Sequence, residues 1–127
     1  MPRRILLVLV FVLAVVSLVA CSGPEVSDAA LCRDYVHRLC IPDICPAVTP
    51  IFTPGTDCET DLLARSGCSS DAFAFTTPDR ATFLNCRLPL LHAGDNVEQH
   101  PDCDDITDSF TNCPAVEQMF SEDGGTP

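Results

Sequence analysis

Eight of the nine cysteines in this chain of 127 residues lie between positions 32 and 113, spaced five to eighteen residues apart. An even set predicts four intramolecular disulfides if the chain reaches an oxidising compartment. Sequence alone leaves about 105 ways of pairing eight cysteines. Each bond contributes about 2–4 kcal/mol, so we expect the fold of a chain this small to depend on the set. The eight residues are Cys32, Cys40, Cys45, Cys58, Cys68, Cys86, Cys103 and Cys113.

Metal ligation is the alternative use for these cysteines. The closest pair is Cys40 and Cys45, and no two cysteines are separated by only two residues. Structural zinc sites usually rely on such short paired spacings. We therefore expect neither zinc nor an iron–sulfur cluster, and no other cofactor.

The first 20 residues have the pattern of a secretory signal peptide. Arg3 and Arg4 precede an apolar run over residues 5–20 that is interrupted only by Ser17. A run of this length is shorter than the roughly 20 residues that a membrane-spanning helix needs. We expect residues 1–20 to be removed after export, which would bring the cysteines into an oxidising compartment.

The leader ends in Leu18-Val19-Ala20-Cys21, which resembles the lipobox of bacterial lipoproteins. That resemblance implies that Cys21 is acylated with diacylglycerol and becomes the first residue of the mature protein. Ordinary cleavage after Ala20 is the alternative, but Leu18 is larger than the small residue such cleavage prefers. In Gram-negative lipoproteins an Asp after the cysteine favours the inner membrane. Ser22 in that place implies the outer membrane, at the periplasmic face or the cell surface.

The expected mature chain has a lipidated tether over 21–28, a cysteine-rich domain over 29–120 and a frayed tail over 121–127. Together, the lipobox and the cysteine density resemble uncharacterised cysteine-rich lipoproteins of GC-rich bacteria such as myxobacteria. That resemblance implies no activity. Without the leader, five arginines face 18 acidic residues, for a net charge near −13. Such a surface repels nucleic acid and anionic lipid, so we expect no nucleic-acid partner.

Apolar periodicity predicts an all-α fold, a small disulfide-stapled bundle of four to five short helices. Leu31, Tyr35 and Leu39 repeat every four residues in the strongest of these segments. Phe73-Ala74-Phe75 is too short for a strand, and we interpret it as a loop that places two rings against the core. The expected helices cover 27–40, 56–67 with Thr56 as cap, 77–89 with Thr77 as cap and Pro78 at its first position, and 101–113 with a last turn at 114–120.

Antiparallel neighbours bring the end of one helix close to the start of the next. On that basis we expect the pairs Cys40–Cys58 and Cys32–Cys68. The same reasoning predicts Cys86–Cys103, which leaves Cys45 to pair with Cys113.

Two groups of residues could carry chemistry. His37 lies three residues after Asp34, and a His–Asp pair on a disulfide-rich helix is similar to secreted phospholipases A2. That family's adjacent cysteines, His-Asp dipeptide and glycine-rich calcium loop are all missing here, which favours a structural histidine. The second group is an acidic cluster beside His100, whose oxygens suit calcium but also suit a helix N-terminus. It comprises Asp102, Asp104, Asp105 and Asp108.

Ser66 and Ser109 have no sequence context that would make either a nucleophile, and no hydrolase, phosphate-binding or zinc-protease motif occurs. We therefore expect a protein without catalysis or a metal, anchored in the cell envelope through lipid on Cys21. It would serve as a binding or interaction module for an envelope protein or ligand. The alternative is a small phospholipase-like hydrolase that uses His37 with an acidic partner. A saposin-like lipid-binding fold is a third option, although saposins carry six cysteines at other spacings.

Overall fold

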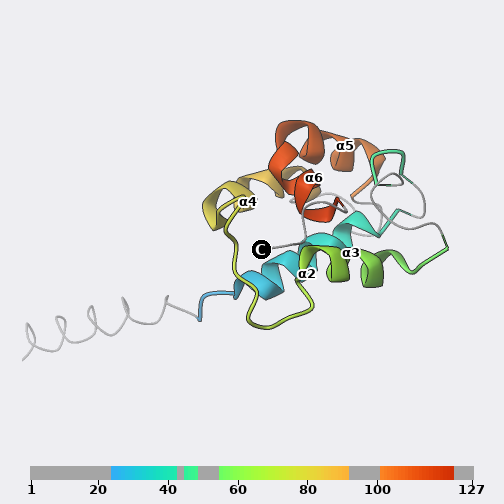
Figure 1. Cartoon of the computed structure of the whole chain (residues 1–127). Helices are drawn as coiled ribbons and strands as arrows, with labels where there is room; N and C mark the ends of the chain where they lie inside the picture. Colours follow the sequence, from blue (N-terminus) through green and yellow to red (C-terminus); the bar gives the residue numbers. More distant parts are fainter. Residues whose placement is uncertain (1–23, 43–44, 49–54, 92–100, 122–127) are drawn as a thin grey trace, which may run out of the picture.

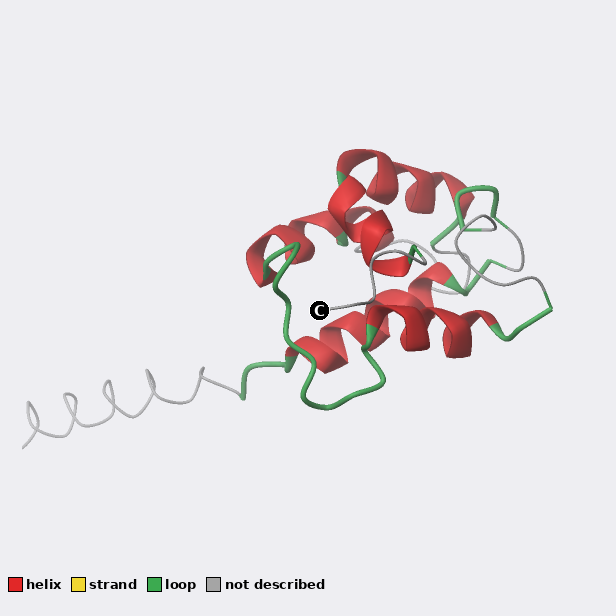
Figure 2. Cartoon of the chain, viewed as in Figure 1, coloured by secondary structure: helices red, strands yellow, loops and turns green. Residues whose placement is uncertain are grey.

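The computed structural model describes residues 24–42, 45–48, 55–91 and 101–121. Within these ranges the chain is all-helical, which confirms the expected fold class (Figure 2). No strand occurs in the described part. Figure 1 labels the α-helices, which are α2 Asp28–Leu39, α3 Cys58–Ser66, α4 Arg80–Cys86, α5 Cys103–Asn112 and α6 Pro114–Phe120; a 3₁₀ helix, η2, covers Leu88–Leu90.

Helices α2 and α3 begin and end close to the expected residues. Ser27 caps α2, where its side chain accepts a hydrogen bond from the backbone N–H of Ala30. The cap of α3 is Asp57 rather than the expected Thr56, and its carboxylate accepts from the N–H of Thr60. Asp is the better N-cap of the two, which explains the shift by one residue. Gly67 ends α3 with a φ of 78°, a left-handed conformation that favours glycine.

The expected start of α4 at Thr77 and Pro78 is wrong by two residues. The peptide bond between them is cis, and α4 begins after Asp79, whose carboxylate accepts from the N–H of Thr82. Helix α4 also ends before residue 89, and Leu88, which lies beyond its end in η2, is 59% exposed.

The helix expected to start at Pro101 and to finish with a last turn at 114–120 is two separate helices in the structure, α5 and α6. Asp102 caps α5 and forms a capping box with Asp105, so the helix itself begins at Cys103. Pro114 then occupies the first position of a separate helix, α6, since proline is favoured there and lacks the N–H that an interior position would need.

The core is built around aromatic rings from four segments. Tyr35 of α2 lies between Phe83 of α4, at 5.1 Å between ring centroids, and Phe120 of α6, at 6.1 Å. Phe75 stacks on Phe83 at 4.1 Å, and Phe73 meets Phe75 edge-on at 5.0 Å. The loop interpretation of residues 73–75 is therefore confirmed, and both of its rings remain half-buried.

The four disulfides confirm half of the expected connectivity. Cys32–Cys68 and Cys40–Cys58 form as predicted and join α2 to α3 and its C-terminal end. The pairs Cys86–Cys103 and Cys45–Cys113 were wrong, because the bonds are instead Cys45–Cys103 and Cys86–Cys113.

The exchange of partners follows from the connection between α4 and α5. Sixteen residues separate Cys86 from Cys103, so these helices are not joined by the short turn that antiparallel neighbours require. The other end of α5 approaches Cys86 instead. Ser109 donates a hydrogen bond of 2.6 Å to the carbonyl of Cys86, which places the last turn of α5, and so Cys113, beside the end of α4.

The only tyrosine of the chain takes part in a buried polar chain. The Tyr35 hydroxyl lies 2.7 Å from Oγ of Ser109, and the Ser109 hydroxyl donates a hydrogen bond to the Cys86 carbonyl. Both residues have no exposed surface. Burial raises the pKa of Tyr35 well above its ordinary value, and the hydrogen bond with Ser109 only partly opposes this.

We expect Tyr35 to stay protonated until the domain unfolds in alkali. An unfolded tyrosine ionises near pH 10, whereas the folded one does not. Above that pH the unfolded state binds fewer protons, so stability falls as the pH rises. Because the chain has one tyrosine and no tryptophan, phenolate absorbance reports Tyr35 alone. The absorbance should appear together with the loss of helical circular dichroism; ionisation near pH 10 with helicity intact would contradict the burial.

Candidate functional site

His37, the histidine that the sequence suggests as a catalytic candidate, lies on α2 in the described part of the chain. Its Nδ1 lies 2.6 Å from Oε1 of Glu59, so the pair joins α2 to the first turn of α3. The expected partner, Asp34, instead accepts from Nε of Arg38 at 3.0 Å and lies 3.8 Å from Arg87. The histidine thus pairs across two helices, next to the Cys40–Cys58 bond that holds them together.

The His37–Glu59 pair is open to solvent. The two side chains are 63% and 45% exposed. A depression of about 300 Å³ lies nearby, between the end of α2 and the start of α3, but His37 is not among its lining residues. The depression is lined by Leu39, Cys40, Pro42, Cys45, Val48, Thr56, Asp57 and Cys58. A carboxylate on Nδ1 can orient a histidine as a general base, yet this ring is solvent-exposed and lies outside the depression beside it.

We expect His37→Ala to change the free energy of unfolding by less than about 1 kcal/mol, since exposed ion pairs and exposed substitutions contribute little. Leu39→Ala is the matched control on the same helix. Leu39 is 1% exposed, and its truncation should cost about 2–5 kcal/mol. Thermal or urea unfolding of both variants checks this. A His37→Ala loss as large as the Leu39→Ala loss would show that the histidine is structurally essential.

The described acidic residues near α5 are arranged as a helix start. Asp102 accepts from the N–H groups of Asp104 and Asp105, and Asp105 accepts in return from the N–H of Asp102 at 3.0 Å. These bonds satisfy the backbone donors that a helix N-terminus leaves open. In the described ranges, no three His, Cys, Asp or Glu side chains are placed to hold a metal ion together. His100 lies outside the described residues.

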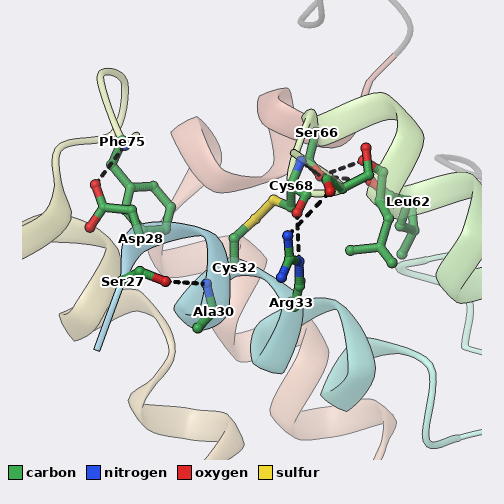
Figure 3. The surroundings of a disulfide bond; sticks show 11 residues. Ser27, Asp28, Ala30, Cys32, Arg33, Leu62, Ser66, Cys68 and Phe75 are labelled. Carbon is green, nitrogen blue, oxygen red and sulfur yellow. Dashed lines mark hydrogen bonds between the residues drawn. A yellow bond between two sulfur atoms is a disulfide. The ribbon is translucent and has the colours of Figure 1, made fainter. Parts of the chain in front are cut away.

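Both serines considered as nucleophiles have structural partners. Ser66 donates to the carbonyl of Leu62 at 2.8 Å, and its oxygen accepts from the N–H of Cys68 (Figure 3). Ser109 is buried in the hydrogen-bonded chain with Tyr35. Throughout the described part of the chain, every buried side-chain nitrogen and oxygen has a hydrogen-bond partner.

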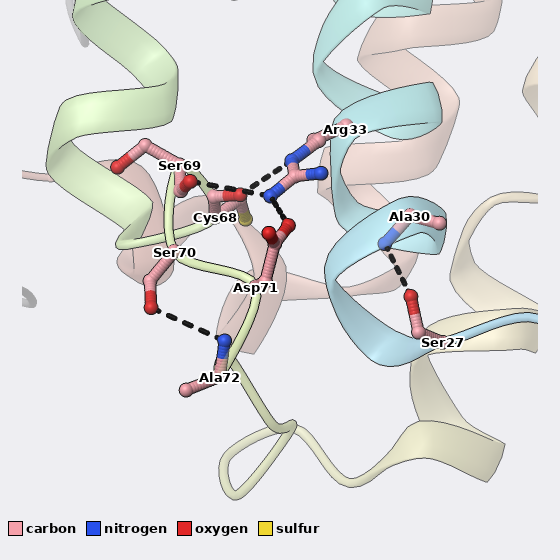
Figure 4. A network of polar contacts seen from close by, with 8 residues as sticks. All are labelled: Ser27, Ala30, Arg33, Cys68, Ser69, Ser70, Asp71 and Ala72. Atoms are coloured by element: carbon pink, nitrogen blue, oxygen red, sulfur yellow. Dashed lines mark hydrogen bonds and ion pairs between the residues drawn. The ribbon is translucent and has the colours of Figure 1, made fainter.

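Arg33 reinforces the Cys32–Cys68 disulfide beside it. Its guanidinium donates to the carbonyls of Cys68 at 2.9 Å and Ser69 at 3.2 Å, and it pairs with Asp71 at 2.6 Å (Figure 4). One guanidinium thus holds the turn that follows α3 against α2. Local sequence patterns could not reveal this contact, because the partners lie 35 or more residues apart.

Every arginine after the leader forms an ion pair with a carboxylate. Besides Arg33, these are Arg38 with Asp34, Arg65 with Asp61, Arg87 with Asp34, and Arg80 with Glu25 and Asp28. Carboxylates of the same domain therefore pair with all five of its arginines.

Cys21, the expected lipidation site, lies outside the described residues, as do the leader and the tail after residue 121. No described helix is both long and apolar enough to cross a membrane. Comparison with known protein families, curated proteins and solved structures finds no match to this chain.

Proposed function

We propose that this protein is a lipoprotein of the cell envelope, anchored in the outer membrane by diacylglycerol and palmitate-type chains on Cys21. The single observation that carries the proposal is the sequence Leu18-Val19-Ala20-Cys21 at the end of an apolar leader too short to span a bilayer. Helix α2 begins at Asp28, so little chain separates Cys21 from the domain.

The helical domain would act as a rigid module for an envelope protein or ligand, without catalysis. Several polar groups of the domain support this, because each has a structural partner. Ser66 and Ser109 donate hydrogen bonds to backbone carbonyls. The arginines pair with carboxylates, and Asp102 and Asp105 cap a helix. Four disulfides in a domain this small restrict conformational change and so favour a rigid surface. Rigid surfaces bind with little loss of conformational entropy.

A second candidate function rests on one observation, the 2.6 Å contact between His37 and Glu59. A carboxylate on Nδ1 holds the imidazole in the tautomer in which Nε2 accepts a proton, as in a hydrolase. The exposure of the pair, and its position outside the depression between α2 and α3, weigh against this candidate.

A substrate screen separates the two candidates. The purified mature protein would be tested on ester, phospholipid and glycan substrates, with and without calcium. If His37 is a general base, His37→Ala should lower turnover on the order of 10²-fold or more. Gln118→Ala, at an exposed position of α6, is the matched control. Turnover that survives Gln118→Ala but not His37→Ala would establish the hydrolase; no turnover on any substrate is the result that our proposal predicts.

A further inference from the structure

The segment that leads from Cys21 into the domain is fixed to the bundle shortly before α2. Arg80 of α4 donates to the carbonyl of Val26 at 2.7 Å and pairs with Glu25 at 3.3 Å and with Asp28. Asp28 also accepts from the N–H of Phe75 at 3.0 Å, which ties the loop before α4 to the same point (Figure 3). Hydrogen bonds from Phe75 and Arg80 lower the pKa of Asp28, so it stays charged at neutral pH.

This attachment limits how far the domain can move from its lipid. Five residue steps separate Cys21 from Val26, a reach of at most about 18 Å for a fully extended chain. Helix α2 has 12 residues and is itself about 18 Å long. The start of α5 is bonded through Cys103 to Cys45, which follows the C-terminal end of α2 in the chain. The start of α5 could therefore reach the bilayer only if the chain between Cys21 and Val26 were fully extended.

The two ends of the bundle also differ in charge. Residues 72–78, Ala-Phe-Ala-Phe-Thr-Thr-Pro, contain no charge and lie beside the tether, where Val26 is 54% exposed. Three of the carboxylates around them are ion-paired, namely Glu25 and Asp28 with Arg80 and Asp71 with Arg33. The fourth is Asp79, which caps α4.

The opposite end carries four aspartates in seven residues, over 102–108, with no basic residue among them. Anionic lipid headgroups repel such a cluster more strongly than they repel the surroundings of residues 72–78, where Arg33 and Arg80 offset part of the carboxylate charge. The length of the tether and the distribution of charge therefore both favour an orientation with residues 72–78 toward the bilayer.

We infer that the face formed by Val26 and residues 72–78 lies against the bilayer that holds the Cys21 lipid, and that the acidic start of α5 points away from it. This inference rests on the proposed lipid anchor. The bilayer surface is the partner of this face, and the outward acidic end is left for partners in the envelope.

The test uses tryptophan as a unique fluorophore, because the chain has none of its own. Full-length Ala74→Trp and Ala72→Trp place it at two exposed positions of the inferred face, and Thr107→Trp places it at an exposed position of α5. Each protein, extracted from membranes, is inserted into phosphatidylcholine vesicles with ordinary or brominated acyl chains. Quenching on the order of twofold is expected at 72 and 74, where a side chain lies within about 10 Å of the acyl chains, and none at 107.

The outcomes are distinguishable. If vesicle-bound protein shows equal quenching at 74 and 107, or none at 72 and 74, the orientation is wrong while the anchor stands. If the purified chain carries no lipid and does not bind vesicles, the proposed anchor fails and the orientation fails with it. Circular dichroism of each variant identifies any that has not folded, and two positions on the inferred face allow one to be lost.

Discussion

Reduction of the four disulfides is expected to abolish the cooperative folded state of the domain. Each bond contributes about 2–4 kcal/mol, so the set contributes about 8–16 kcal/mol, which is comparable to the whole stability of an ordinary domain, about 5–15 kcal/mol. Helices of 7 to 12 residues do not persist in water without tertiary contacts. The reduced chain should therefore lose most of its helical circular dichroism.

Single bonds can be ranked by the loops they close. Cys45–Cys103 closes a loop of 58 residues and Cys40–Cys58 one of 18. Loop entropy predicts that the first contributes about 1 kcal/mol more than the second. The paired variants Cys45→Ala with Cys103→Ala, and Cys40→Ala with Cys58→Ala, measure both by urea unfolding, with non-reducing peptide maps confirming the remaining bonds. A cooperative thermal transition that persists in the fully reduced chain would contradict the dependence on crosslinks.

Replacement of Cys21 by Ala should move the protein from the membrane fraction to the soluble fraction. A buried methylene adds about 0.8 kcal/mol of membrane affinity, so two or three acyl chains anchor a protein nearly permanently. The described domain contains no helix that could replace them. Detergent phase partitioning of the wild type and of Cys21→Ala measures the change, which should be close to complete.

The matched control is Ser22→Ala, which alters the neighbouring residue and keeps the thiol. It should remain in the detergent phase and label with a palmitate analogue, as the wild type should. Cys21→Ala protein that still enters the detergent phase and still labels would mean that the lipid, if any, is attached elsewhere.

Sequence patterns predicted those parts of the fold that local chemistry decides. Ser27 begins α2 and Gly67 ends α3 because capping depends on neighbouring residues. The pairs Cys32–Cys68 and Cys40–Cys58 follow from two adjacent antiparallel helices. The other two bonds depend on how α5 crosses the end of α4 through Ser109 and Cys86, a contact over 23 residues that no local pattern encodes.

The candidate site was predictable to a similar extent. His37 was identified as a histidine with a carboxylate neighbour, but the neighbour is Glu59 of α3 and not Asp34. Spacing on one helix favoured Asp34, whereas packing brings Arg87 toward Asp34 beside its helical partner Arg38. The contact of Arg80 with Val26 and Asp28 was missed, because its partners are more than 50 residues away in the chain.

The mass of the mature N-terminal peptide, isolated from membranes, is the most direct test of the lipid anchor. We expect a peptide that begins at Cys21 and carries a diacylglyceryl group on its sulfur, with any further chain on its amino group. A peptide that begins at Cys21 or Ser22 with no lipid mass, or one that retains the apolar leader over residues 5–20, would contradict it.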